Sequence, residues 1–256
     1  MTSSIVCLTV ARERNLANAP ITEAIIDFRV KHTQGFQVEK FLTLKAELAS
    51  EFPIVEPRTI VEGAFEIKIG EPIEAKKREE LQGYWFKSTD GLNIAQFRSD
   101  GFTFNRLRPY TSWEEIFPNA WRLWQFYAGT GAAEFVTRIA TRFVNRLTFR
   151  TPVSDLAKYL TAPPRGPEGI SANIAGFLTR VVIEVAEKGL SSNITQALEK
   201  GVDPSSITVI LDIDAYRQKQ FDVQDKSLFE TFDGLRKLKN DIFFNSITEE
   251  TAKLLE

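Results

Sequence analysis

Alternating apolar and polar residues predict strands near the start of the chain. In ITEAIIDFRV, Ile26 and Phe28 share one face, whereas Asp27 and Arg29 share the other. Successive side chains of a strand point to opposite faces, so this pattern is typical of a half-buried strand. The segment TIVEGAFEIKIG alternates in the same way, and we expect a second strand there.

Two Asp-Gly pairs predict hairpin turns in the segment GYWFKSTDGLNIAQFRSDGFTFNRL. They are Asp90-Gly91 and Asp100-Gly101, and each lies between alternating runs. Asp-Gly in that position is the strongest short hairpin signal. We therefore expect three short strands that pair in an antiparallel meander.

Apolar residues at helical spacing predict helices in three segments. The segment TSWEEIFPNAWRLWQFYAGTG opens with a capping box, Ser112 and Glu115, and we expect Pro118 to split it in two. Ser227 and Glu230 form a similar box at the start of another helix. The three segments cover residues 38–52, 111–131 and 227–244, and we expect a capped turn at 246–256.

The second half of the chain repeats this kind of order. A strand at 134–150 precedes a short helix that begins at Ser154, and two strands rich in β-branched residues follow at 175–188 and 205–218. Strands joined through tight turns and followed by helices are typical of an α+β fold. We expect one domain over residues 1–256, with a mainly antiparallel sheet that can curl and long helices on one face.

The order of elements suggests an internal duplication. It is β-α-ββββ-α in residues 20–130 and β-α-ββ-α in residues 131–247. The motif Asn-Arg-Leu occurs in both parts, at 105–107 and 145–147, and a proline and a capped helix follow each time. A three-residue match also arises by chance, so this echo alone does not establish a repeat.

Composition places the chain among globular proteins and narrows the chemistry. It has 256 residues, 43% of them hydrophobic, and a net charge of −2. This balance argues against disorder and against a dedicated nucleic-acid binder. The single cysteine, Cys7, favours a reducing, cytoplasmic location, and we expect no membrane span. His32 is the single histidine, so any metal site or catalytic triad that needs a histidine would depend on this residue alone.

Four arginines share one face of the strand EFVTRIATRFVNRLTFR. They are Arg138, Arg142, Arg146 and Arg150. Neighbours in this series lie about 13 Å apart in a strand, and they repel each other unless anions lie between them. The opposite face carries apolar residues, namely Ile139, Phe143, Leu147 and Phe149.

Two interpretations of this arginine face remain open. Asp212 and Asp214 oppose the apolar face of their own strand, so the face can be laced with cross-strand ion pairs. Alternatively, the sheet encloses a groove in which arginines bind an anion and the two aspartates hold a divalent metal ion. The candidate ligand-binding residues are Arg138, Arg142, Arg146, Arg106 and Arg180, and the candidate metal ligands are Asp212 and Asp214.

Several longer segments resemble a known family. NAPITEAIIDFRV, DGFTFNRLRPYTSWEE, RIATRFVNRL and LRKLKNDIFFNSITEE are similar to a sporadically distributed family of uncharacterised bacterial proteins of about this length. The family brings no catalytic residues that could be transferred. Its patchy occurrence resembles that of accessory genes, such as phage-defence or toxin–antitoxin loci.

We therefore expect a non-enzymatic binding or regulatory protein of a bacterial accessory system. It would act through a protein partner or an anionic ligand such as a nucleotide, with no cofactor. The alternative is a metal-dependent phosphoryl-transfer or hydrolysis enzyme that uses the charged sheet face. A nucleic-acid ligand is disfavoured by the net charge of −2.

Overall fold

The protein forms a single nine-stranded antiparallel sheet with helices, as a computed structural model shows. The structure describes residues 9–66, 74–153, 155–167, 174–200 and 205–256. Cys7, Ser154 and the end of the segment at 59–70 lie outside these ranges. The α+β class and the mainly antiparallel sheet are confirmed, and the sheet is open rather than closed.

The strands lie in the order β2-β3-β4-β5-β1-β6-β9-β8-β7. Every neighbouring pair is antiparallel. In chain order the strands are β1 (Ile21–His32), β2 (Ile54–Glu66), β3 (Glu74–Lys87), β4 (Asn93–Arg98), β5 (Gly101–Leu107), β6 (Ala133–Arg150), β7 (Leu178–Val185), β8 (Leu190–Lys200) and β9 (Ser206–Phe221).

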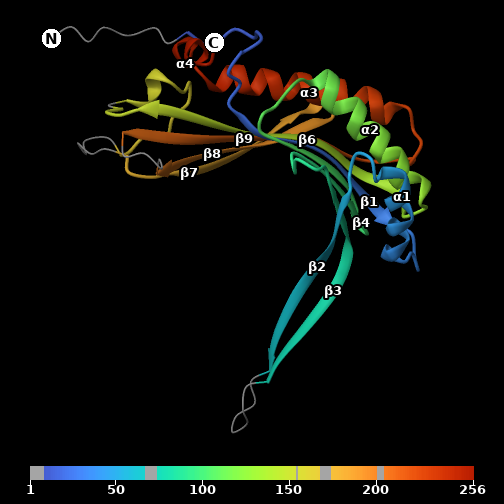
Figure 1. The fold of residues 1–256 in the computed structure, drawn as a ribbon. Coiled ribbons are helices and arrows are strands. Elements are labelled where there is room, and N and C mark those ends of the chain that lie inside the picture. Colours follow the sequence, from blue (N-terminus) through green and yellow to red (C-terminus); the bar gives the residue numbers. More distant parts are fainter. Residues whose placement is uncertain (1–8, 67–73, 154, 168–173, 201–204) are drawn as a thin grey trace, which may run out of the picture.

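The described ranges contain four α-helices and three short 3-10 helices, of which α3 and α4 follow the last strand and the others connect strands. The α-helices are α1 (Lys45–Leu48), α2 (Trp113–Gly129), α3 (Ser227–Ser246) and α4 (Glu249–Leu254). The 3-10 helices are η1 (Val38–Leu44), η2 (Leu156–Lys158) and η3 (Ala186–Lys188). Helix α2 packs on β4 and β5, and α3 packs on β6, β8 and β9. Figure 1 shows both helices over the outer side of the bent sheet, while β2 and β3 extend as a two-stranded arm.

The core lies between the sheet and these helices. Phe28 of β1 stacks on Trp124 of α2, with ring centroids 4.2 Å apart and planes 3° from parallel. Phe143 and Leu147 of β6 are buried, as the alternation in that strand predicts. Such aromatic contacts bury large apolar surfaces and fix side-chain geometry. The helices therefore hold one face of the central strands, and the polar side chains project from the other.

Two local predictions are wrong, and one strand was missed. Pro118 lies within α2 without splitting it. Strand β8 was not expected, since its sequence LSSNITQALEK is largely polar. Ser227 does not cap α3, because the helix begins there and the Ser227 amide donates to the Asp225 carboxylate at 2.8 Å.

The strand order is compatible with two related halves. Strands β1 and β6 pair at the centre of the sheet, and β1 lies beside β5 just as β6 lies beside β9. The two Asn-Arg-Leu motifs lie in β5 and β6, which do not correspond in this arrangement. The internal duplication thus stays a prediction.

We predict that Gly101→Ala strongly destabilises the fold. Gly101 has φ +149°, and a Cβ at this position would lie 2.0 Å from the backbone oxygen of Phe28. Strand β5 would have to move away from β1, at a cost of about 2–4 kcal/mol. Urea denaturation measures this change in the free energy of unfolding.

Gly129→Ala is the matched control for this substitution. Gly129 has no positive φ, and nothing lies within 4 Å of its Cβ position. Its stability should stay the same or rise by up to about 1 kcal/mol, because alanine favours the helical conformation. Equal effects of the two substitutions would contradict the close approach of β5 to β1.

Candidate functional site

Polar side chains from six neighbouring strands meet on the side of the sheet opposite the helices. We call this surface the charged face, and it comprises Asp27, Arg29, Arg98, Asp100, Arg138, Arg142, Asp212 and Asp214 together with Thr103 and Asn193. The alternation within each strand places them there, because the intervening residues are buried under the helices.

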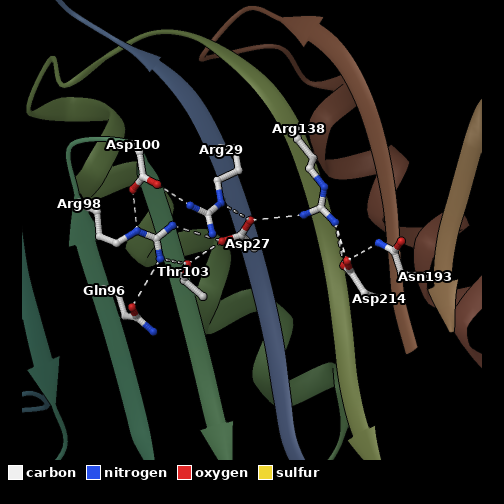
Figure 2. Close-up of polar contacts among 9 residues, drawn as sticks. All are labelled: Asp27, Arg29, Gln96, Arg98, Asp100, Thr103, Arg138, Asn193 and Asp214. Atoms are coloured by element: carbon white, nitrogen blue, oxygen red, sulfur yellow. Dashed lines mark hydrogen bonds and ion pairs between the residues drawn. The ribbon is translucent and has the colours of Figure 1, made fainter. Parts of the chain in front are cut away.

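Asp27 is the centre of the charged face (Figure 2). Its carboxylate accepts a hydrogen bond from the Thr103 hydroxyl at 2.6 Å. It also lies 3.0 Å from a guanidinium nitrogen of Arg29, 3.5 Å from one of Arg98 and 3.6 Å from one of Arg138. One carboxylate therefore joins arginines from β1, β4 and β6.

Arg98 is the most buried cation of this group, with 4% of its side chain exposed. Tyr127 of α2 fixes the strand from behind by donating to the Arg98 carbonyl at 2.9 Å. The pKa of Asp100 lies below its ordinary value: partial burial opposes ionisation, but the positive charges of Arg98, Arg29 and Arg58 outweigh it. The neighbouring arginines thus favour the ionised form of Asp100.

The predicted arginines of β6 are paired with carboxylates. Arg138 donates to both oxygens of Asp214, at 2.9 and 2.8 Å, and Arg142 binds both oxygens of Asp212. Arg146 lies 2.6 Å from Glu199 on β8. The prediction that Asp212 and Asp214 share the arginine face is therefore confirmed.

Arg106 and Arg180 have uncharged partners. Arg106 donates to the Pro109 carbonyl at 3.1 Å and to the Asn93 side chain at 3.3 Å. Arg180 donates to the Asn193 side chain at 2.9 Å. The structure does not gather the five predicted arginines into one site, since Arg106 and Arg180 lie on β5 and β7, at a distance from each other across the sheet.

Two shallow depressions mark the charged face. One, of about 270 Å³, is lined by Asp27, Arg98 and Arg138 among others. The other, of about 260 Å³, is lined by Arg142, Arg180 and both aspartates. Within the described ranges, no three His, Cys, Asp or Glu residues are grouped so as to hold a metal ion. Asp212 and Asp214 instead use their oxygens for arginine.

A larger cavity, which the sequence did not reveal, lies on the other side of the sheet. It has a volume of about 480 Å³. We call it the lysine pocket, and it is lined by Glu13, Arg14, Leu16, Tyr110, Ser112, Trp113, Glu114, Phe143, Asn145, Arg236, Lys239, Asn240, Phe243 and Phe244, among others. It lies between the segment before β1, the start of α2, and α3.

Lys239 is the unusual group of the lysine pocket. Its Nζ lies 4.0 Å from the centroid of the Phe143 ring. Burial lowers the pKa of Lys239 to about 8, and Arg236 adds to this effect while Glu13 opposes it. Tyr110 packs edge-on against the same Phe143 ring, and burial raises its pKa to about 12.

The other charged residues of the lysine pocket have partners. Arg236 lies 2.7 Å from Glu114, and the Asn240 side chain donates to Glu13 at 2.7 Å. Arg14 lies 2.8 Å from Glu249. In the described part of the chain, Lys239 has no carboxylate within 4.0 Å. A spacing pattern along α3 could not reveal this, because the pairing depends on three separate segments.

Comparison with known proteins does not place this chain in a family. No family model, curated protein or solved structure matches the chain. The resemblance to the sporadically distributed bacterial family therefore stays a prediction. Among the helices that the structure describes, none combines the length and the apolar character needed to cross a membrane.

We predict that Asp27→Asn destabilises the protein much more than Asp100→Asn. Both carboxylates contact Arg29 and Arg98, but the Asp27 side chain is 10% exposed and that of Asp100 is 51% exposed. Loss of the buried charge leaves arginines poorly compensated, at a cost of about 2–4 kcal/mol. Loss of the exposed charge costs less than about 1 kcal/mol. Urea denaturation of both variants measures the difference, and equal losses would contradict the central role of Asp27.

Proposed function

We propose that this protein is a non-enzymatic binding or regulatory protein, and that its ligand is a small organic anion held in the lysine pocket. The observation that carries the proposal is a cation, Lys239, that lacks a carboxylate partner among the described residues and lines an aromatic cavity. An unpaired charge in such surroundings raises the free energy of the folded protein. Groups that destabilise the fold in this way are typical of ligand sites.

The charge balance of the pocket favours an anion. Glu114 pairs with Arg236, and Glu13 hydrogen-bonds the neutral Asn240, so Glu13 offsets the charge of Lys239 only from a distance and not in a direct ion pair. The ring of Phe143 attracts the ammonium group but provides only part of the stabilisation that a carboxylate gives. A carboxylate or phosphate of the ligand would complete the ion pair without any change in these contacts.

The walls of the pocket favour a ligand with an aromatic or apolar body. Trp113, Phe143 and Phe243 line it together with the polar side chains of Tyr110 and Asn145. These rings lie among polar and charged side chains, so the lining suits a small molecule that carries both an apolar body and polar groups. A volume of about 480 Å³ suits a molecule of this class.

The charged face supports an enzymatic alternative less well. A metal-dependent phosphoryl-transfer or hydrolysis reaction there would need free carboxylate oxygens for the metal. Arg142 binds Asp212, and Arg138 binds Asp214. Turnover of nucleotides or polyphosphate with magnesium, lost in Asp212→Asn, would establish this alternative against our proposal.

The proposal includes the cellular setting in which this protein acts. The resemblance to a sporadically distributed bacterial family supports a role in an accessory system such as phage defence or toxin–antitoxin control. The single cysteine supports a cytoplasmic location. The genes beside this one test the setting: neighbours drawn only from housekeeping operons would contradict it.

We predict that benzoate and phenyl phosphate bind the wild-type protein, whereas uncharged benzamide does not. Lys239→Gln should weaken binding at least about tenfold, because it removes the unpaired cation. Isothermal titration calorimetry measures the affinities. Lys237→Gln is the matched control on the same helix, since Lys237 is exposed and pairs with Asp241 at 3.1 Å. Equal affinities for benzoate and benzamide would sink the proposal.

We also predict a characteristic pH dependence of stability. The pKa of Lys239 is about 8 in the folded protein, against an ordinary value of 10.5, so the unfolded chain binds more protons between these values. Stability from this group therefore rises as the pH increases from about 8 to 10.5.

Lys239→Met isolates this effect. The variant should be more stable than the wild type at pH 7 by roughly 1–3 kcal/mol, since it removes a buried charge. The gap should close as the pH rises through the same window, whereas Lys237→Met should show no such trend. Thermal melts across this pH range measure the difference, and a constant gap would show that Lys239 does not titrate there.

A further inference from the structure

We infer that strand β7 pairs with β7 of a second copy of this chain, antiparallel and about a two-fold axis at Val182. The two sheets would then join into one continuous sheet. This inference is independent of the proposed ligand. It rests on an edge strand along which no other described strand lies, and on the positions of its two charged residues.

The outer edge of β7 is available for pairing. Strand β7 ends the sheet beside β8, and no other described strand lies along it (Figure 1). Leu178 is 74% exposed, and Val181 and Val182 are more than half exposed. The pairing of β7 with β8 is regular over its whole length, without a bulge that would bend the edge away. Long, exposed, apolar edges are sites where another strand can add.

The opposite edge of the sheet is less suited to pairing. Strand β2 carries Pro57, which has no N–H to donate. Strand β7 has the sequence LTRVVIEV, which contains neither the proline nor the lysine that most often protects an edge, and its two charges are of opposite sign. The two edges thus differ, and β7 is the one open to another strand.

The backbone of β7 shows which residues face outward. The Leu198 amide donates to the Phe177 carbonyl at 3.0 Å, just before β7 begins. Inward and outward backbone groups alternate along an antiparallel strand, so Arg180, Val182 and Glu184 direct their N–H and C=O groups away from β8. A second strand can hydrogen-bond to these three residues.

The charges select one register. When Val182 faces Val182 of the second copy, Arg180 of each copy lies directly opposite Glu184 of the other. Both residues also lie on the same face of β7, because they are four residues apart. A two-fold axis at Arg180 or at Glu184 would instead place like charges opposite each other, which is destabilising.

The remaining contacts of this register are apolar or neutral. On the other face of the strand, Val181 would lie opposite Ile183 of the second copy. Neither Arg180 nor Glu184 has an oppositely charged residue within 4.0 Å in the described ranges, and Arg180 contacts the Asn193 amide. The second copy therefore supplies the partners that both charges lack.

The test is the oligomeric state of charge variants. Sedimentation velocity from micromolar to millimolar concentrations should show a wild-type dimer. Arg180→Glu and Glu184→Arg should each weaken the dimer about tenfold or more, since each places like charges opposite one another. The double variant Arg180→Glu/Glu184→Arg should regain wild-type dimerisation. A wild-type monomer over the whole range, or no rescue in the double variant, would overturn the inference.

Mixing the single variants tests the register directly. A chain with glutamate at both positions faces a chain with arginine at both, so an equimolar mixture should form heterodimers. Val182→Pro provides a backbone test, because it removes an outward N–H and leaves the pairing with β8 intact. It should abolish the dimer while thermal melting shows a folded protein. A folded Val182→Pro variant that still dimerises would also overturn the inference.

Discussion

Strand β1 must satisfy opposite demands on its two faces. Phe28 stacks on Trp124 within the apolar core, and the adjacent residue, Asp27, binds arginines from three strands on the charged face. A shift of one residue in the pairing of β1 would bury the carboxylate and expose the aromatic ring. The fold therefore depends on one register of this central strand, and both faces select it.

The ion pairs of β6 and β9 extend the same selection along the sheet. Arg142 lies opposite Asp214 but binds Asp212, while Asp214 binds Arg138 further along β6. Each carboxylate thus binds a different arginine. A shift of two residues in the pairing of β6 with β9 would break these ion pairs, even though the apolar face would remain buried. Half-exposed pairs add little net stability. Their contribution is better described as selection of one register.

Much of the sheet was predictable from sequence, because alternation is a local property. It placed Asp212 with the arginines and Phe143 with the core. The polar strand β8 was missed, since its pairing with β7 and β9 decides its conformation. Pro118 did not split α2, since Ile116, Phe117 and Ala120 around it are all buried and hold the helix in place. Lys239 was overlooked for a related reason: a lysine in an amphipathic helix is usually solvated, and only tertiary packing partly buries this one.

The two sides of the sheet differ in whether their positive side chains form ion pairs. On the charged face, Arg138 and Arg142 meet carboxylates from the neighbouring strand. In the lysine pocket, Glu114 pairs with Arg236 and Glu13 contacts the neutral Asn240, so Lys239 is left without a direct carboxylate partner among the described residues. A methionine would fill the same space without the cost of burying an ammonium group. On the charged face, the positive and negative side chains pair with one another. The ammonium group in the lysine pocket would gain a direct ionic partner only from a bound ligand.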